Sequence, residues 1–181
     1  MTKVNHSLIS LAALITLLLP AAASAKSAEI PHVEKVVTKA PPKVVYDTNL
    51  KFRKTYPQNV KELSRTDKHC VVEETFNVLP VIGKAKCIYK ETYVPDKEVT
   101  YEMVESQRFK AFEGKWTITP ANGGKHTNLS LSSYIDPGIN LPFAKQITKM
   151  ETKKGIKKRL AAVKHNSEKQ QVALGDGGGT Q

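Results

Sequence analysis

Apolar and polar residues alternate with a period of two between positions 109 and 132, which predicts two β-strands. Between them, Asn122-Gly123-Gly124 supplies residue types that tolerate positive φ, so we expect a tight hairpin turn. One face of the hairpin is apolar and holds Phe112, Trp116 and Ile118 on its first strand and Leu129 and Leu131 on its second. This segment therefore predicts a sheet with one buried face.

The chain before this hairpin predicts five more strands and one helix. The strands are expected at residues 32–38, 60–65, 69–78, 83–93 and 98–107. The helix is expected at 43–56, where Pro57 ends it. After the hairpin, Asn140 can cap a long C-terminal helix and Pro142 can occupy its first turn. The short spacings between strands favour antiparallel pairing, so the sequence predicts an α+β fold.

The N-terminal segment is typical of a secretory signal peptide. Lys3 precedes an apolar run from Leu8 to Leu19, which is shorter than a bilayer-spanning helix requires, and small residues follow at 23–25. We expect cleavage after Ala25 and export to the periplasm or the extracellular space, and a retained membrane anchor is the alternative. The predicted organisation is therefore a signal peptide at 1–25, one domain at 26–168, and a flexible Gly-rich tail at 169–181.

The order of these elements resembles the START-like superfamily, also called SRPBCC, which includes polyketide cyclases and coenzyme Q-binding proteins. The resemblance rests on Ala40-Pro41-Pro42 after the first strand, Val45 and Tyr46 in the following helix, Pro57 before the second strand, the FxGxW motif from Phe112 to Trp116, and the Pro-initiated C-terminal helix. It implies a helix-grip fold, in which a curved antiparallel sheet of about seven strands wraps the C-terminal helix. The cavity between them commonly holds a lipid, an isoprenoid quinone, a polyketide or another hydrophobic molecule.

The apolar face of the predicted sheet suits such a cavity, because it is rich in aromatic residues. The candidate ligand-binding residues are Phe76, Tyr89, Tyr101, Met103, Phe112, Trp116, Leu129, Leu131, Phe143 and Ile147. In particular, Phe112, Trp116 and Phe143 are expected to face one another across the interior. The alternative is a filled core, since an alternating apolar face packs against a helix with or without a ligand.

Two carboxylates share the phase of these apolar residues. Glu74 and Glu91 would be costly on an inner face unless they are paired, neutral or near water. One interpretation is that they orient a ligand hydroxyl or act as acid and base, since burial raises a carboxyl pKa. The other is that both lie near strand ends or at a bulge, where they reach solvent.

The two cysteines also share the inner face of strands that we expect to be neighbours. An oxidising compartment would allow a disulfide between Cys70 and Cys87, unless the hairpin register places their sulfurs too far apart. No histidine lies at ligand spacing with another ligand, and neither HExxH nor GxSxG occurs. The sequence therefore predicts no catalytic residue, metal site or cofactor.

The chain carries a net charge of +11, much of it near the C-terminus. One interpretation is that the C-terminal helix contacts an anionic membrane surface, and the alternative is a solvated basic face. The residues expected at such a contact are Lys153, Lys154, Lys157, Lys158 and Arg159. The apolar stripe of Phe143, Ile147 and Met150 is rotated from that of Ile156, Leu160 and Val163, which predicts a bend near Gly155. Export and the lack of a nucleic-acid motif argue against nucleic acid as a partner.

These features favour an exported, non-catalytic carrier of a hydrophobic small molecule or lipid. A carrier needs only a cavity and a route to membranes, whereas an enzyme also needs positioned acid and base groups. The alternatives are a small cyclase-like or hydrolase-like enzyme acting in the same cavity, and a packed domain used for protein or membrane-surface contacts.

Overall fold

The computed structural model describes residues 31–52, 59–79 and 83–176. These residues form seven strands, two α-helices and one short 3-10 turn. The strands are β1 (His32–Thr38), β2 (Val60–Arg65), β3 (His69–Leu79), β4 (Gly83–Val94), β5 (Glu98–Ser106), β6 (Ala111–Ala121) and β7 (His126–Asp136). The α-helices are α1 (Pro42–Phe52) and α2 (Ala144–Asp176), and the turn is η2 (Asn122–Gly124).

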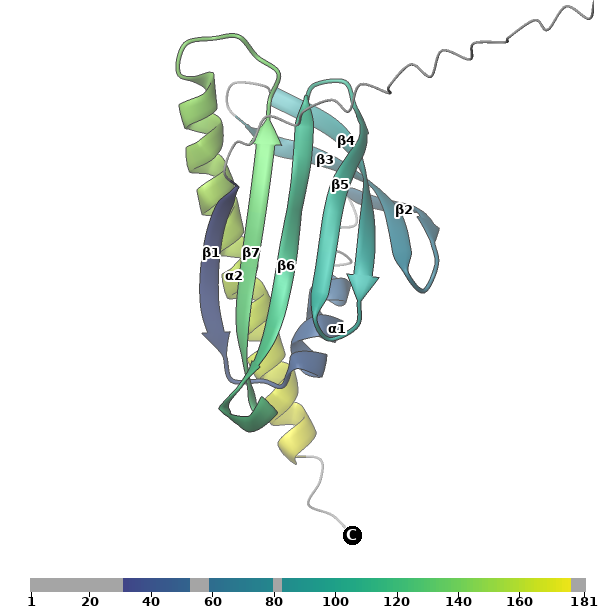
Figure 1. Ribbon diagram of the computed structural model, residues 1–181, viewed down its shortest axis with the longest axis vertical. Helices are drawn as coiled ribbons and strands as arrows, with labels where there is room; N and C mark the ends of the chain where they lie inside the picture. The colour runs from purple at the N-terminus through teal and green to yellow at the C-terminus, as the bar shows by residue number, and fades with distance from the viewer. Residues whose placement is uncertain (1–30, 53–58, 80–82, 177–181) are drawn as a thin grey trace, which may run out of the picture.

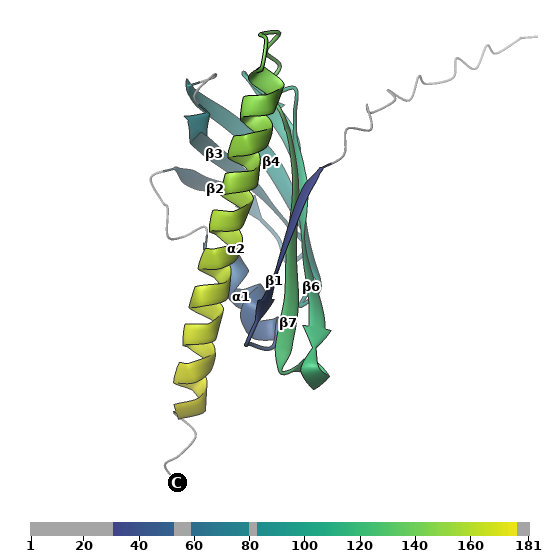
Figure 2. The same cartoon turned by 90° about the vertical axis from the view of Figure 1, so that its left-hand side faces the viewer.

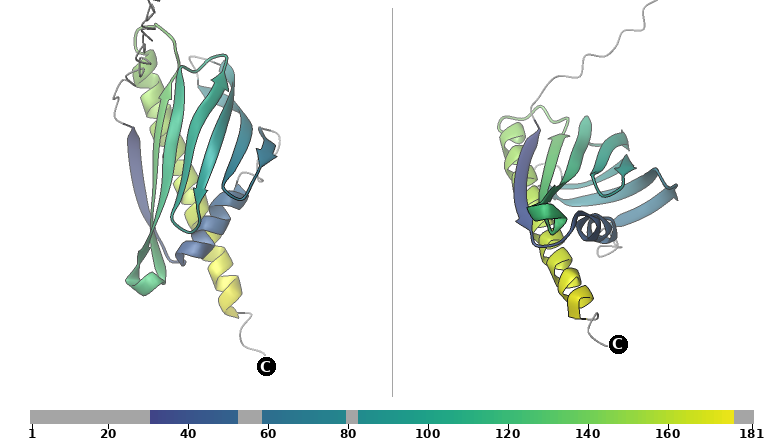
Figure 3. Two further views of the ribbon diagram at one scale, coloured as in Figure 1. Left: turned by 45° about the vertical axis from the view of Figure 1, so that its right-hand side comes forward. Right: turned by 60° about the horizontal axis from the view of Figure 1, so that its bottom comes forward.

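The strands form one antiparallel sheet in the order β1-β7-β6-β5-β4-β3-β2. Figure 1 shows the sheet with α2 running behind β1 and β7, and Figure 2 shows the full length of α2 against one face of the sheet. The end-on view in Figure 3 shows that the sheet curves around this helix, with α1 beside it. The predicted helix-grip α+β fold is confirmed.

The inner face of the sheet follows the predicted alternation. On β4, the buried residues Ala85, Cys87, Tyr89, Glu91 and Tyr93 alternate with more exposed ones. The hairpin of β6 and β7 likewise buries the aromatic and aliphatic residues predicted for its inner face. At η2, Asn122, Gly123 and Gly124 all have positive φ, as the turn chemistry predicts.

Gly114 on β6 allows a close approach between two strands. It lies opposite Tyr101 in the β5–β6 register, and the Tyr101 hydroxyl donates to the carbonyl oxygen of Ser132 on β7 at 3.4 Å. A Cβ atom at position 114 would overlap both the Tyr101 hydroxyl and that carbonyl oxygen. The glycine of the FxGxW motif therefore lets a tyrosine ring lie across the strand.

The face of α2 that packs on the sheet differs from the prediction in its N-terminal half. Ile156, Leu160 and Val163 are buried as predicted, but Ala144, Thr148 and Thr152 continue their row toward the N-terminus. Small residues fit there because the helix lies close to β1 and β7. α2 is one continuous helix through position 155. Its buried residues already form a single row, so the predicted bend near Gly155 is not needed.

The predicted position of Phe143 is wrong. Its side chain is 71% exposed, so it does not face Phe112 and Trp116, which are both buried. Met150, from the same predicted stripe, is 64% exposed. Hydrophobicity alone predicted these two residues to lie in the core, whereas the close spacing between α2 and the sheet buries the small residues Ala144, Thr148 and Thr152 instead.

The helix also runs further than predicted. α2 continues to Asp176, and Gln170 accepts a hydrogen bond at 3.2 Å from the hydroxyl of Thr48 on α1. The predicted flexible tail therefore begins too early, because residues 169–176 are helical. The predicted signal peptide at 1–25 and the predicted helix end at 53–56 lie outside the described residues. Among the described helices, none is both long and apolar enough to cross a membrane.

The predicted disulfide is wrong. Cys70 lies opposite Glu91 and Cys87 lies opposite Glu74, so the two cysteines are offset by four residues along the β3–β4 ladder. Four residues of strand correspond to about 13 Å, whereas a disulfide needs Cα atoms within about 7 Å. Both cysteines are free and buried.

We expect both thiols to be protected in the folded protein. Burial raises the pKa of the Cys87 thiol to about 12, and the nearby Glu74 charge adds to this rise. Because the thiolate is the reactive form, a disulfide-exchange reagent should modify neither cysteine rapidly at neutral pH. After denaturation without reductant, the same reagent should titrate both thiols. If the reagent titrates neither thiol after denaturation, the two cysteines are joined in a disulfide and the offset between them is wrong.

Candidate binding cavity

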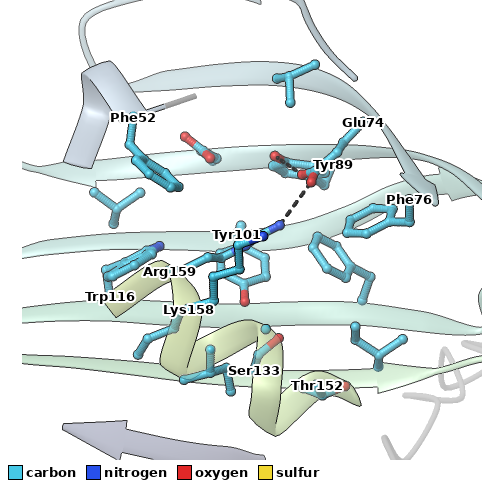
Figure 4. A pocket seen from close by; sticks show the side chains of 18 of the residues that line it. Phe52, Glu74, Phe76, Tyr89, Tyr101, Trp116, Ser133, Thr152, Lys158 and Arg159 are labelled. Atoms are coloured by element: carbon cyan, nitrogen blue, oxygen red, sulfur yellow. Dashed lines mark hydrogen bonds and ion pairs between the residues drawn. The ribbon is translucent and has the colours of Figure 1, made fainter. Parts of the chain in front are cut away.

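A cavity of about 500 Å³ lies between α2 and the inner face of the sheet. This volume is within the usual range for small-molecule sites, roughly 300–1,000 Å³. α2 contributes one wall, the strands contribute the opposite wall, and residues of α1 and β2 line one side. In Figure 4, Phe52 and Trp116 lie toward one end of the cavity and Phe76 toward the other.

Aromatic side chains form the sheet wall of this cavity. The Phe112 ring is central, with ring centroids 5.2 Å from Phe76, 5.2 Å from Tyr89 and 5.0 Å from Tyr101. The rings meet in edge-on or tilted geometries, which are the favourable arrangements for aromatic pairs. These contacts hold the wall in place without filling the space next to α2.

One polar cluster crosses the cavity from α2 to the sheet. Nη2 of Arg159 on α2 donates to Oε1 of Glu74 on β3 at 2.9 Å. The Tyr89 hydroxyl on β4 donates to Oε2 of the same carboxylate at 2.9 Å. Figure 4 shows Arg159 extending from the helix across the cavity toward Glu74. Each oxygen of the carboxylate therefore has a donor from a different element, and the helix is tied to the sheet.

The electrostatics of the cavity keep these groups in defined protonation states. The Glu74 carboxylate raises the pKa of Arg159 well above its ordinary value, against the opposing effect of burial. Burial raises the pKa of Tyr101 to about 12, although the charge of Arg159 works in the opposite direction. Arg159 is therefore charged and Tyr101 neutral near pH 7, so Tyr101 can donate a hydrogen bond but is a poor proton acceptor.

Glu91 is the second carboxylate in the cavity wall. It is 6% exposed, and its Oε2 accepts a hydrogen bond from the Tyr93 hydroxyl at 3.0 Å. Glu74 has a side chain that is only 13% exposed. Both carboxylates keep the phase of the inner face. The interpretation that they reach solvent near a strand end or a bulge is therefore wrong for the buried Glu91, whereas Glu74 stays partly accessible through the cavity.

Comparison with known proteins shows what this architecture is similar to. No established family profile matches the sequence, and no curated protein matches it. The ZhuI aromatase/cyclase from Streptomyces sp. R1128 has a similar structure, with a TM-score of 0.66 and 16% identity, over 78% of this chain and 94% of that chain. A START superfamily protein from Mycobacterium smegmatis matches with a TM-score of 0.52 and 13% identity, over 80% of this chain and 98% of that chain. The fold is START-like.

A third similar structure is a protein from Thermus thermophilus, with a TM-score of 0.60 and 17% identity, over 80% of this chain and 99% of that chain. Such low identities establish the START-like fold and leave the chemistry of the cavity to the residues themselves.

The START-like cavity brings together most of the predicted ligand-binding residues. Of these, Phe76, Tyr89, Tyr101, Phe112, Trp116 and Leu131 line it. Leu129 is fully buried in the core and Met103 packs against the core, and neither is among the residues that line the described cavity. The exposed Phe143 and the partly exposed Ile147 are also outside it. Whether the lining residues bind a ligand remains a prediction.

Several lining residues were not identified from the sequence. They include Phe52 on α1, Ser133 and Ile135 on β7, and Thr152 on α2. Ser133 and Ile135 share the phase of Leu129 and Leu131, so the alternation of β7 contained the signal. Phe52 and Thr152 depend on how the helices are placed against the sheet, which the alternation of strands does not reveal.

The predicted membrane-contact residues occupy three different environments. Lys154 and Lys158 are exposed at the rim of the START-like cavity. Lys153 and Lys157 lie on the other side of α2, with Nζ atoms 4.0 Å and 3.9 Å from Oε1 of Glu34 on β1. Arg159 points into the cavity, so its assignment to a membrane surface is wrong.

Within the described ranges, no three His, Cys, Asp or Glu residues lie close enough together to hold a metal ion. The ionisable side chains that line the cavity are Glu74, Glu91, Glu151, Tyr89, Tyr101, Lys154, Lys158 and Arg159. Their arrangement suits hydrogen bonding to a ligand more readily than proton transfer.

Proposed function

We propose that this protein binds a hydrophobic small molecule or lipid in its START-like cavity and carries it outside the cytoplasm. The observation that carries this proposal is an aromatic-walled space of about 500 Å³ with a polar cluster at one place in its wall. A ligand with an apolar body and one polar group would bury its body against Phe112 and Trp116. Its polar group would lie near Arg159.

The polar cluster favours a neutral hydrogen-bonding group on the ligand. A guanidinium has five N–H donors, so a carbonyl, quinone or hydroxyl oxygen can accept from Arg159 while Glu74 keeps its bond. A strong anion is less favoured, because Glu74 already offsets the charge of Arg159. The Thr152 hydroxyl is buried and has no hydrogen-bond partner among the described residues, so it is a second group that the ligand can satisfy.

A cyclase-like or hydrolase-like activity is the alternative in the same cavity. The similarity to the structure of an aromatase/cyclase favours it, together with the carboxylates of Glu74 and Glu91 on the sheet wall. We favour the carrier because Glu74 already accepts two hydrogen bonds and the raised pKa of Tyr101 makes it a weak acid–base group near pH 7. Export is inferred from the signal-like segment at 1–25.

A cavity-blocking variant tests the proposed site. Gly155 lines the cavity, and a Cβ atom added there meets nothing within 4 Å, so a large side chain can enter the space without displacing the core. We expect Gly155→Trp to weaken binding of the fluorescent apolar probe N-phenyl-1-naphthylamine at least about 10-fold, because an indole placed on the cavity lining would take up volume that the probe needs. Fluorescence titration measures this affinity.

The matched control is Gly155→Ala, which also improves helix propensity but leaves the cavity open. It should bind the probe as the wild type does and be more stable by about 0.5–1 kcal/mol. If Gly155→Trp binds the probe as tightly as Gly155→Ala, the probe does not enter this cavity and the proposed site is wrong.

A further inference from the structure

The outer side of α2 carries apolar residues that the fold leaves in solvent. Ile147, Met150, Lys154 and Lys158 are spaced so that they share one face of the helix, and Phe143 stands at its start, where its carbonyl accepts from the Ile147 N–H at 3.0 Å. We call these five residues the rim strip. Two of its members are large and strongly exposed, Phe143 at 71% and Met150 at 64%. The strip is thus apolar at one end and basic at the other.

The rim strip ends at the cavity. Lys154 and Lys158 belong to the residues that line the cavity on its α2 side. From Ile147 to Lys158 the helix rises about 16 Å, so an apolar surface leads over a short distance to the proposed ligand site. In Figure 2 this half of α2 forms the upper part of the helix, below the loop that joins it to β7.

Phe143 has a strained backbone. Its φ of 64° lies in the left-handed region, which is unfavourable for a bulky side chain. A nearby residue of the same loop, Leu141, is also 58% exposed. A strained conformation that leaves 71% of an aromatic side chain in solvent contributes little packing within the described fold, so its benefit is expected from a partner outside the chain.

The charge around the rim strip identifies the chemistry of that partner. Between Phe143 and Lys164 the sequence has seven lysines and one arginine against a single acidic residue, Glu151. Like charges would oppose self-association through two copies of this face. An anionic lipid surface complements the lysines and accepts the aromatic and aliphatic side chains at the same time.

We propose that the rim strip docks α2 on an anionic lipid bilayer, with Phe143, Ile147 and Met150 entering the interface and Lys154 and Lys158 contacting phosphates beside the cavity rim. Phe143, Ile147 and Met150, the apolar stripe that the sequence predicted on the inner side of the helix, thus face the membrane. This inference deepens the proposed carrier function, because it gives the cavity a surface from which a hydrophobic molecule can enter.

Vesicle sedimentation of the folded chain without residues 1–25 tests the proposal. The wild type should bind vesicles of phosphatidylcholine mixed with phosphatidylglycerol, bind phosphatidylcholine alone weakly, and lose affinity as salt is raised. The Phe143→Ser/Met150→Ser variant should bind anionic vesicles about 10-fold more weakly. The Lys154→Glu/Lys158→Glu variant should lose at least about 25-fold, since each lysine near an anionic surface contributes about fivefold and the introduced carboxylates are repelled.

Matched controls place the same changes elsewhere on the surface. Val104→Ser/Val172→Ser removes two residues that are 61% and 62% exposed, and Lys90→Glu/Lys97→Glu reverses two charges away from α2. Both should bind anionic vesicles as the wild type does. The proposal is overturned if the wild type binds no vesicles or binds neutral and anionic vesicles equally. It is also overturned if the rim-strip variants bind anionic vesicles as the wild type does. Capture of a protein through the strip without vesicle binding would also overturn it.

Probe binding separates this inference from the proposed function. The Phe143→Ser/Met150→Ser variant should not change the affinity for N-phenyl-1-naphthylamine measured without vesicles by more than about twofold, because both side chains are exposed and neither lines the cavity. Probe binding without vesicle binding would reject the docking surface and keep the carrier cavity. Vesicle binding without probe binding would reject the cavity and keep the docking surface.

Discussion

Replacing Arg159 with methionine is expected to lower the free energy of unfolding by about 2 kcal/mol, because it leaves the Glu74 carboxylate inside the cavity without its cationic partner. Breaking a fully buried pair costs more, about 3–5 kcal/mol. Here 36% of the Arg159 side chain and 13% of the Glu74 side chain remain accessible, since the cavity is open, so the effect is smaller. Urea denaturation monitored by Trp116 fluorescence measures it.

The same change should weaken binding of a cavity ligand that has a carbonyl or hydroxyl group by about 10-fold or more, through loss of charged hydrogen-bond donors. The double variant Glu74→Gln/Arg159→Met should recover much of the stability but not the ligand affinity, because it removes the lone carboxylate and still lacks the guanidinium. Lys158→Met, at the neighbouring exposed position, is the control for losing a positive charge. If Arg159→Met is as stable as Lys158→Met, the cluster does not tie α2 to the sheet.

A second large effect is expected at Gly114, where alanine should destabilise the fold by about 3 kcal/mol. The added methyl group would overlap the Tyr101 hydroxyl and the Ser132 carbonyl oxygen, so either the tyrosine ring or the β6–β7 ladder must move. Because Tyr101 lines the cavity, the shift should also reduce probe affinity. The urea midpoint and the yield of soluble protein report the loss of stability.

Lys115→Ala is the matched control on the same strand. The Lys115 side chain is exposed, and its salt bridge to Glu98, with Nζ 3.3 Å from Oε2, lies at the surface. It should change stability by less than about 1 kcal/mol. A Gly114→Ala protein as stable as Lys115→Ala would mean that the close approach of Tyr101 to β6 is not required.

The sheet could be predicted from the sequence because most of its inner face follows a period of two, most clearly on β4 and β7. β1 and β2 have the predicted bounds, and each of β3, β4 and β5 ends within a residue of its predicted end. The register between β3 and β4 could not be predicted in this way. Alternation fixes the face of each strand but not its offset, so Cys70 and Cys87 were placed on the correct face and paired wrongly.

The helix was harder to predict because two of its faces are apolar. The buried face uses Ala144, Thr148 and Thr152, whose small side chains carry little hydrophobic signal, while the stronger signal of Phe143 and Met150 belongs to an exposed face. Close packing of α2 against the sheet selects size over hydrophobicity there.

The polar cluster could have been found from two charges in the inner phase. Glu74 alternates with the apolar residues of β3, and Arg159 lies three residues after Ile156 and four before Val163, on the buried side of α2. Opposite charges on two facing inner surfaces predict a pair, because neither charge is stable there alone. Treating Arg159 as one more residue of a basic surface concealed this.

Native mass spectrometry of the exported protein determines whether the cavity holds a hydrophobic molecule. The full-length chain would be expressed with its N-terminal segment and recovered from the exported fraction, beside its Gly155→Trp variant. We expect the wild type to carry a bound species that dissociates on activation and extracts into organic solvent, and we expect Gly155→Trp to lack it. A wild type that carries no such species, and that takes up none from a lipid extract of its host, would contradict the proposed carrier function.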